Sequence, residues 1–554
     1  MVRGPYELFS LQRAVTARDF EYLAVAGSAA VARARAFTRA ATLSFASPGE
    51  VEVVLVPHVG AETRPDWRLP ADVLLSHHVE QARLQTQRDL NDRSALGTSC
   101  LATWASYKAV SVSAKVVVQP QENPEAVRQR IDDRLYQSIR PLPTPLNTSG
   151  WSFGQPLRAS NVYGMLERAE PGVRFVENVK FTVDEAPDRD VRALAADQTQ
   201  PDTWYAGSAE LLFRSTNGGT GWEPVGRFPG EQVRRVVPAP AAVRPGMIAR
   251  PGAVAVLTRR SDDAGSGIYV SADLGESWVK VAELQAGVAD LAWIDRDEVG
   301  ALLVASDVGL YEVSLLPGAV PLQVLVDPDD ADRGFYAVSS FTSERGVSGV
   351  AVAAQAQFGV YLSTDGGRQG TFGNVGLAGL DTRTVAVQYD GPATLLWVGT
   401  GEADPNRPGQ GCFRARLFEA DVRWETMAAG WGGGTCWDLT FAGRTVFAGT
   451  QSGGVLRLDA STGQPTWRAP DINCGLPLRD RPRFAAVEAV TAAPGGAPVL
   501  AGGPRGVYRT ADGETWEPTA SREIRDVVTL PDTWLLCSGE HKIEVVRQGA
   551  TPGD

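Results

Sequence analysis

The sequence predicts a multidomain protein: an N-terminal α+β domain over residues 1–185, an all-β propeller of seven or eight four-stranded blades over 186–548, and a short tail over 549–554. Two observations support this division. Helix and strand patterns are mixed in the first third of the chain, and a repeat of short strands then replaces them. A chain of 554 residues also exceeds what one hydrophobic core usually organises.

The elements before residue 95 are predicted from local signals. Thr16 is a good N-cap for the first helix, and Ser47-Pro48-Gly49 is a turn signal between two apolar strands. The predicted elements are a helix over 17–26, strands over 31–43 and 51–56, and a helical segment over 70–90.

The stretch from Leu96 to Val183 is the most informative part of the chain. Alternating apolar residues predict a strand, and a second apolar series at a spacing of four predicts a helix beginning at Asn123-Pro124-Glu125. Ser160 is expected to cap another helix, and Val173–Val183 to form the closing strand. The alternating residues are Val110, Val112, Ala114, Val116 and Val118, and the helical series is Val127, Ile131, Leu135 and Ile139.

These segments, in this order, resemble the baseplate J-like family. The resemblance is carried by Leu96-Gly97-Thr98, by Pro124-Glu125-Ala126-Val127-Arg128 and by the Gly-Trp segment 150–156, and it extends upstream over the first third of the chain. Members are wedge proteins of phage tail baseplates and of phage-derived contractile injection systems. They usually carry a further upstream domain, which we expect to be missing or reduced here.

The family's Gly-Trp segment is a constrained loop rich in turn residues and aromatic side chains. We favour the interpretation that its aromatic residues fill the domain's own core, and a contact with a partner protein is the alternative. The residues concerned are Trp151, Phe153, Gly154 and Pro156.

A repeat begins near Val191, and its units recur at intervals of about 40 to 55 residues, the range of propeller blades. Each unit reads as an apolar strand, a strand ending in a small-Gly-small motif, a strand opening with Gly-apolar-Tyr, and a fourth strand. Second-strand markers are Tyr205-Ala206-Gly207, Val398-Gly399-Thr400, Ala448-Gly449-Thr450 and Ala501-Gly502-Gly503. Units begin near Val191, Val233, Val288, Phe335, Thr382, Cys436 and Phe484, and a shorter set spans 524–546. We favour eight blades, the last completed by a strand near the start of the ring, with seven as the alternative.

Four units carry versions of the Asp-box turn found in sialidases and in many non-enzymatic propellers. In this turn a Ser, Asp or Asn oxygen accepts backbone amides, a glycine takes the left-handed conformation, and a tryptophan packs under the hairpin. We therefore interpret these residues as structural. They are Ser215, Asn217, Gly219 and Trp222; Ser271, Asp273, Gly275 and Trp278; Ser363, Asp365 and Gly367; and Thr510, Asp512 and Trp516.

Composition and isolated motifs argue against several other functions. A formal charge of −12 disfavours nucleic-acid binding, and no apolar window is long enough for a membrane helix or a secretory signal. The five cysteines form no CxxC pair and are expected to be buried thiols, and the pair His77-His78 is poorly spaced for a metal. We expect no cofactor, no metal and no enzymatic activity.

The resemblance implies a structural baseplate wedge subunit. Its expected partners are other wedge subunits, as homo- and hetero-oligomers in a ring, together with spike, hub and sheath proteins. Synthesis and assembly are expected in the cytoplasm, as part of a phage-tail-like particle that stays there or is released. The propeller is expected to brace or dock the particle. The alternatives are a propeller that binds a receptor or glycan and, as a third candidate, a glycan-cleaving enzyme.

Overall fold

The computed structural model describes residues 13–38, 49–60, 67–167, 171–183, 185–262, 265–296, 300–316, 319–419, 421–521 and 523–547. The chain divides into two compact units. The first combines Met1–Glu185 with Ser521–Asp554, and the second is Ala186–Ala520. Residues 521–548 therefore differ from the prediction, which placed them in the propeller.

A three-stranded sheet and three helices form the start of the first unit. Strand β1 (Val31–Thr38) pairs antiparallel with β2 (Glu50–Pro57), which pairs parallel with β3 (Ser99–Trp104). The helices are α2 (Ala17–Gly27), α3 (Ala71–Ser76) and α4 (Glu80–Asn91). Thr16 caps α2 in a reciprocal capping box with Asp19.

Two details of this region differ from the prediction or lie beyond what the structure describes. The segment predicted as one helical stretch is two helices, because the chain leaves helical geometry between His77 and Val79. Residues 39–43 of the predicted strand, and Ser47 and Pro48 of the predicted turn, lie outside the described residues.

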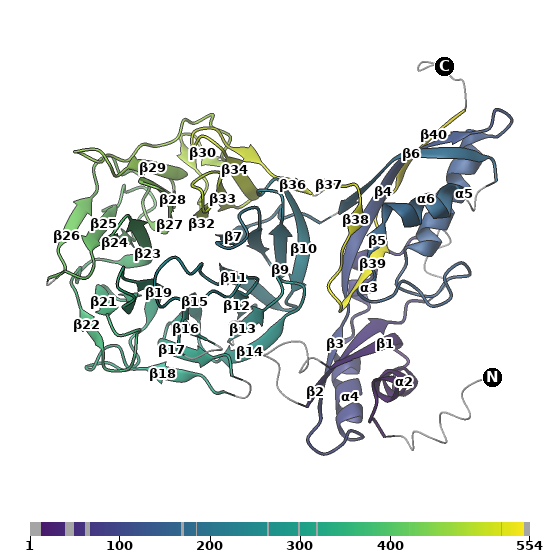
Figure 1. The fold of residues 1–554 in the computed structure, drawn as a ribbon, viewed down its shortest axis with the longest axis horizontal. Coiled ribbons are helices and arrows are strands. Elements are labelled where there is room, and N and C mark those ends of the chain that lie inside the picture. The colour runs from purple at the N-terminus through teal and green to yellow at the C-terminus, as the bar shows by residue number, and fades with distance from the viewer. Residues whose placement is uncertain are drawn as a thin grey trace. The chain divides into compact units, whose positions relative to one another are not determined.

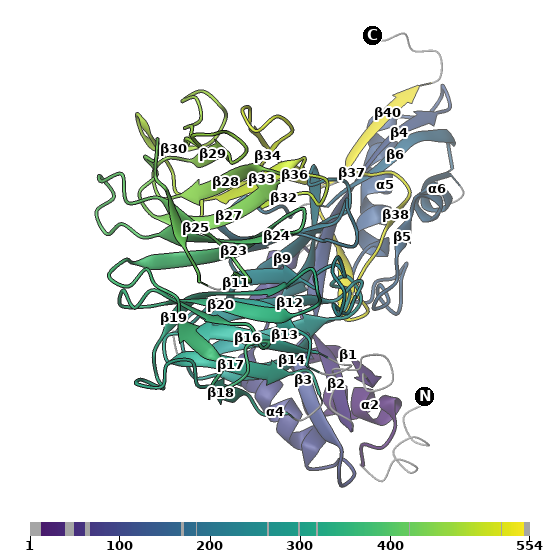
Figure 2. The ribbon, with the colours of Figure 1, turned by 60° about the vertical axis from the view of Figure 1, so that its left-hand side comes forward.

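The larger sheet of the first unit has the order β37-β6-β4-β39, with β40 also paired to β4. Its strands are β4 (Ser106–Val118), β6 (Val173–Val183), β37 (Glu523–Ile524), β39 (Trp534–Ser538) and β40 (Lys542–Arg547), and a second small sheet pairs β5 (Leu157–Arg158) with β38 (Val527–Val528). Figures 1 and 2 show β40, from the end of the chain, beside β4.

Two helices pack against this sheet. Helix α5 (Pro124–Ser138) begins at Asn123, whose side chain accepts the amides of Glu125 and Ala126, and its apolar series is buried as the spacing predicted. Helix α6 (Ala159–Glu167) begins one residue before Ser160, so Ser160 lies inside the helix and does not cap it.

The C-terminal segment belongs to the first unit because it completes that unit's core. Trp534, Leu536 and Ile543 are buried in the same apolar cluster as Val112 and Ile131. Strand β39 pairs parallel with β4, with Trp534 opposite Ser106. A pairing between residues more than 400 positions apart leaves no local pattern in the sequence, so repeat counting alone assigned the segment to the propeller.

The second unit is a ring of seven antiparallel sheets, with one further two-stranded hairpin (Figure 1). The first three sheets are β7 (Val191–Ala196), β8 (Trp204–Ser208), β9 (Leu211–Ser215), β10 (Gly221–Arg227) and β36 (Ala520–Ser521); β11 (Glu231–Pro238), β12 (Val254–Arg260), β13 (Ser266–Ser271) and β14 (Val279–Leu284); and β15 (Val288–Ile294), β16 (Ala301–Ser306), β17 (Gly309–Ser314) and β18 (Leu322–Val324).

The remaining four sheets follow in chain order. They are β19 (Phe335–Thr342), β20 (Ser348–Ala354), β21 (Val360–Ser363) and β22 (Phe372–Asn374); β23 (Thr382–Asp390), β24 (Ala393–Thr400), β25 (Cys412–Arg416) and β26 (Trp424–Met427); β27 (Cys436–Ala442), β28 (Thr445–Thr450) and β29 (Val455–Asp459); and β32 (Ala489–Ala492), β33 (Val499–Gly503), β34 (Gly506–Thr510) and β35 (Glu517–Pro518). The hairpin β30 (Leu478–Asp480) and β31 (Arg483–Phe484) lies between the last two in sequence.

The ring closes with seven blades. The inner strands β7, β11, β15, β19, β23, β27 and β32 contact one another in sequence, and β32 contacts β7. The favoured count of eight blades is therefore wrong, because the set over 524–546 that suggested an eighth blade lies in the first unit.

The second-strand glycines that marked the repeat are explained by contacts between blades. A Cβ atom on Gly502 would lie 2.6 Å from the carbonyl oxygen of Val191, which is the contact that closes the ring. Equivalent Cβ atoms would lie 2.6 Å from Cys436 at Gly399 and 2.7 Å from Val487 at Gly449. Only glycine allows the next inner strand to approach this closely.

Candidate functional site

The Asp-box turns form compact hydrogen-bonded hairpins at four places in the propeller. In the first, Ser215 Oγ donates to Asn217 Oδ1 and accepts the amide of Gly219, while Asn217 Oδ1 accepts the amide of Gly221. The second repeats this arrangement with Ser271, Asp273 and Gly275. Gly219, Gly275, Gly367 and Gly513 have positive φ, which glycine adopts without strain.

The tryptophans of these turns are buried or half-buried beneath them. The Trp222 indole N–H donates to Thr519 Oγ1, and the Trp278 indole N–H donates to the carbonyl of Val225 in the preceding blade. Trp516 is 3% exposed. These side chains act as anchors between neighbouring segments.

The third and fourth turns vary the pattern. Ser363 Oγ accepts the amides of Asp365 and Gly367 and lies 2.6 Å from Thr371 Oγ1. In the fourth turn, hydrogen bonds from the amides of Thr515 and Glu514 lower the pKa of Asp512 to about 2. Asp512 is exposed to solvent, so its carboxylate stabilises the turn locally.

The Gly-Trp loop of the first unit packs inside that unit. Trp151 is 4% exposed, and its indole N–H donates to the carbonyl of Gln155. Phe153 is half-buried, packs edge-on against Phe37 and lies under the guanidinium of Arg33. Gly154 has positive φ and lies close to Asp532, and Pro156 is half-buried. The two aromatic side chains therefore contribute to packing within the unit.

A salt bridge crosses the central channel of the propeller. Arg235 on β11 lies 2.9 Å from Asp290 on β15 and 3.6 Å from Asp438 on β27, which is not a neighbouring blade. Each carboxylate also accepts two backbone amides, one of them from the next blade: Val338 for Asp290 and Val490 for Asp438. Burial raises the pKa of both carboxyl groups, and Arg235 opposes that shift.

A ring of side chains, most of them polar or aromatic, surrounds one end of the channel. Six inner strands carry a register shift near their start. The residues at the shifts are Arg192, Arg234, Ala289, Tyr336, Arg383 and Trp437. Glu488 precedes the seventh inner strand. Because all inner strands run in the same direction around a propeller, these residues lie at a single end of the channel.

Two arginines of this ring form salt bridges with acidic side chains of the same unit. Arg192 lies 2.7 Å from Asp190 and 3.4 Å from Glu488, and Arg383 lies 2.8 Å from Asp381. The Arg383 guanidinium also stacks 4.1 Å from the ring centroid of Tyr336. The positive charges of Arg192 and Arg383 are therefore already balanced, which differs from an arginine cluster held open for an anionic substrate.

A cavity of about 520 Å³ occupies the opposite end of the channel. It is lined by residues from the C-terminal ends of the inner strands, and the charged residue in its lining is Asp295, which is paired with Arg250 at 2.6 Å. Its volume is within the range of small-molecule sites, roughly 300–1,000 Å³. Sequence reasoning missed this cavity because its lining residues come from the ends of strands in different repeats.

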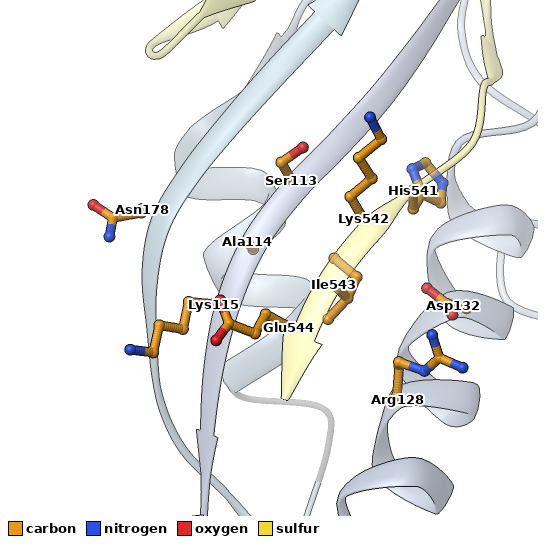
Figure 3. A pocket seen from close by; sticks show the side chains of 10 residues that line it. All are labelled: Ser113, Ala114, Lys115, Arg128, Asp132, Asn178, His541, Lys542, Ile543 and Glu544. Atoms are coloured by element: carbon orange, nitrogen blue, oxygen red, sulfur yellow. The ribbon is translucent and has the colours of Figure 1, made fainter. Parts of the chain in front are cut away.

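The first unit has an open pocket of about 550 Å³ between β4, the start of β40 and α5 (Figure 3). His541, 9% exposed, accepts the Val112 amide through Nδ1 and stacks on Tyr136. Burial lowers the pKa of His541 to about 3, and the Nε2 atom has no hydrogen-bond partner among the described residues. Asp132 on α5 also lines this pocket (Figure 3), and burial raises its pKa to about 6.

Several other features bear on chemistry. All five cysteines are buried thiols, and Cys412 and Cys436 lie 3.9 Å apart between Sγ atoms. The described residues contain no group of three His, Cys, Asp or Glu side chains arranged to hold a metal. None of the helices in the described part of the chain combines the length and apolarity needed to span a bilayer.

No family model and no curated protein matches this sequence. Among solved structures, YCF48 from Cyanidioschyzon merolae is 12% identical over 60% of this chain and 97% of its own, with a TM-score of 0.41. The GH74 xyloglucanase from Xanthomonas campestris is 15% identical over 60% of this chain, with a TM-score of 0.42. This chain covers 53% of the xyloglucanase, about half its length. These neighbours are β-propeller-like proteins, and at such identities and scores the likeness carries no argument about activity.

Proposed function

We propose that the chain is a structural wedge subunit of the baseplate in a phage-tail-like contractile injection system. In this proposal the first unit assembles with neighbouring subunits, and the propeller is an appendage inserted into it. The proposal rests on the order of the family segments between Leu96 and Val183. The observation that carries it furthest is that the chain leaves the first unit at Glu185 and returns at Ser521 to complete its sheet.

Insertion places the propeller between two segments of the first unit. Strand β37, just after the propeller, pairs with β6, just before it, through Glu523 opposite Thr182. The two connections therefore leave the first unit from adjacent strands. Two connections restrain the motion of an appendage more than a single linker does. A propeller that braces an assembly needs such restraint.

The interior of the propeller also favours a structural role. Arg235 joins three inner strands across the channel, and the Asp-box tryptophans anchor one segment to another. Arg192 and Arg383, at one end of the channel, are balanced by nearby acids. These features suit a rigid body, and they supply no arrangement of nucleophile, base and oxyanion donors.

The partners of this proposal are other wedge subunits in a ring, together with spike, hub and sheath proteins. The ring transmits a signal by changes in the angles between subunits, which needs large interfaces able to repack. Synthesis and assembly take place in the cytoplasm. The proposed activity is mechanical, and no enzymatic step belongs to it.

The proposal is tested by recovering the full chain from its native host through an affinity tag placed after Asp554. We expect sheath and tube proteins to be recovered with it, and syringe-like particles in negative-stain electron microscopy. Recovery of the chain as a monomer, without sheath or tube proteins, would contradict the wedge role.

A second candidate function is recognition of a receptor or glycan by the propeller. The observation that favours it is the cavity of about 520 Å³ at one end of the channel. This function is compatible with the wedge role, because a baseplate appendage can both brace and dock.

A further inference from the structure

The loop over residues 239–253, here called the strap, extends from the second blade across the end of the channel that contains the cavity. Its two ends are held together, because the Ala239 amide donates to the carbonyl of Ala253. Ala241, Val243 and Met247 of the strap contribute to the lining of the cavity. The strap is therefore a closed surface loop that forms part of the cavity wall.

The strap contacts three further blades in succession. Near its return, the Ile248 amide and the Arg250 guanidinium both donate to Asp295, just after β15. Farther along, Gly246 approaches Gly346 in the loop between β19 and β20. At its tip Arg244 reaches the fifth blade, where its guanidinium donates to the carbonyl of Gly391 and lies 4.8 Å from the ring centroid of Tyr389.

The tip contact lies at the surface of the propeller. The Arg244 hydrogen bond lies at the surface, and Val243 beside it is 63% exposed. An exposed cation–π contact contributes about 0.5–1 kcal/mol. By contrast, the Arg250–Asp295 pair is joined at 2.6 Å near the root, with the Arg250 side chain 10% exposed. The strap is thus attached near its root by an ion pair whose arginine is mostly buried, and at its tip by a surface contact.

The cavity that the strap borders is rich in hydroxyl groups, and the charged residue of its lining, Asp295, is paired with Arg250. Ser339, Ser340 and Thr491 line it, and their hydroxyls make no hydrogen bond within the described part of the chain. Its aromatic lining residues are Trp293, Phe341, Tyr389 and Phe441. The indole N–H of Trp293 is satisfied by the carbonyl of Val237, so Trp293 offers mainly an apolar surface.

We propose, building on the second candidate function, that this cavity binds an uncharged polyhydroxylated ligand of the saccharide class, and that the strap controls entry through its Arg244 contact. Free hydroxyls can exchange hydrogen bonds with sugar hydroxyls, and aromatic side chains provide the apolar surface on which a sugar ring packs. A charged ligand is disfavoured, because the Asp295 carboxylate is already neutralised by Arg250 and a buried charge without a partner is costly. The cavity lies at the opposite end of the channel from Arg192 and Arg383.

Binding is tested on the full chain with maltotriose and N,N′-diacetylchitobiose as neutral probes and N-acetylneuraminic acid as a charged probe. Saturation-transfer NMR identifies the probe that binds, and calorimetry measures its affinity. We expect a neutral probe to bind and its affinity to fall by at least ~10-fold, which corresponds to about 1.4 kcal/mol, in the cavity-filling variant Ser340→Phe. Ser340→Ala removes the hydroxyl without filling the cavity, and its affinity should fall less than that of Ser340→Phe.

Thr491→Phe fills the same cavity from a different blade and repeats the test if Ser340→Phe does not fold. Binding of the charged probe alone would overturn the proposal. Failure of both neutral probes to bind would also overturn it, as would binding that survives both filling variants. None of these results bears on particle recovery, so failure of this proposal is distinguishable from failure of the wedge role.

Control by the strap is tested with a reporter thiol, Ser340→Cys, labelled by a maleimide and located by peptide mass spectrometry. The five native cysteines are buried and provide an internal baseline. Adding Arg244→Gln, which removes the cation–π contact, should raise the labelling rate several-fold. Arg345→Gln, in an exposed loop at the same end of the propeller, should leave the rate unchanged. Equal rates in the Arg244 and Arg345 variants would show that the strap does not control entry.

Discussion

The two units of this chain are built in opposite ways. Every sheet of the propeller, apart from the short added strand β36, pairs strands that follow one another in sequence, so each blade is assembled from one local segment. The larger sheet of the first unit places β4 and β6 beside strands that follow residue 520. A protein can thus contain a locally encoded domain inside a domain that is complete only when its last strands are present. The predictions that follow test this difference.

The largest expected effect is the loss of the first unit when its last strands are removed. A chain ending at Ser521 lacks Leu535 and Leu536, both fully buried, and Trp534, which is 3% exposed. Each such side chain contributes roughly 1.5–3 kcal/mol on burial, and domains are stable by only about 5–15 kcal/mol. We expect amide hydrogen exchange to become fast in α5 while the propeller strands stay protected. A chain ending at Arg547 is the control and should exchange like the full protein.

Arg235→Met should destabilise the propeller by about 3 kcal/mol, because it leaves Asp290 and Asp438 buried without their cation. Burial already raises the pKa of both carboxyl groups in the folded state. A raised folded-state pKa means that the folded state binds protons more tightly, so the penalty should shrink as pH falls below it. Urea unfolding of the native chain and of Arg235→Met at pH 8 and at pH 4 measures the loss of unfolding free energy. An equal loss at both pH values would contradict the role assigned to Arg235.

Gly502→Ala should weaken the closure of the ring by about 1–3 kcal/mol, the usual cost of overpacking. The added Cβ would lie 2.6 Å from the carbonyl oxygen of Val191, which belongs to the first blade. Gly495→Ala is the matched control, because nothing lies within 4 Å of its Cβ. The midpoint temperatures of thermal unfolding of the two variants should differ by several degrees. Equal midpoints would mean that the blades close without this contact.

The smallest effect is expected at the exposed fourth Asp-box turn. The folded-state pKa of Asp512 is lowered to about 2 by turn amides, so its carboxylate contributes stability that is present above the unfolded pKa of about 3.9. This contribution should be lost as pH falls from about 4 to 2. NMR titration of the turn amides of Glu514 and Thr515 measures it, with Asp512→Asn as the variant that lacks the titration. A midpoint near 4 in the native chain would contradict the assigned hydrogen bonds.

The sequence predicted best what depends on neighbouring residues. Thr16 and Asn123 cap their helices as expected, and the Asp-box residues form their turns because all the groups involved lie within a few positions. The repeat itself predicted the propeller. The same local reasoning failed at Ser160, where the helix begins one residue earlier, and at His77, where a helical pattern is interrupted.

What could not be predicted depends on contacts between distant segments. The pairing of Trp534 with Ser106 has no counterpart in the local pattern, so the last strands were counted as part of the ring. His541 looks isolated in sequence, but it is buried against Tyr136 and accepts the Val112 amide. Arg235 and Asp438 meet only across the channel. Both residues follow a register shift of their inner strand, which only the strand pairing reveals, so no sequence signal predicted the bridge.

The central claim is that the first unit is an assembling wedge subunit into which the propeller is inserted. The most direct test replaces Ala186–Ala520 by a short Gly-Ser turn, since Thr182 and Glu523 already lie on adjacent paired strands. The tagged native chain and this shortened chain are then expressed in the native host, and the recovered particles are imaged by electron microscopy. The account predicts that both chains recover sheath and tube proteins, with propeller density present only for the native chain. Recovery of neither sheath nor tube with the native chain, under conditions that preserve particles, would contradict it.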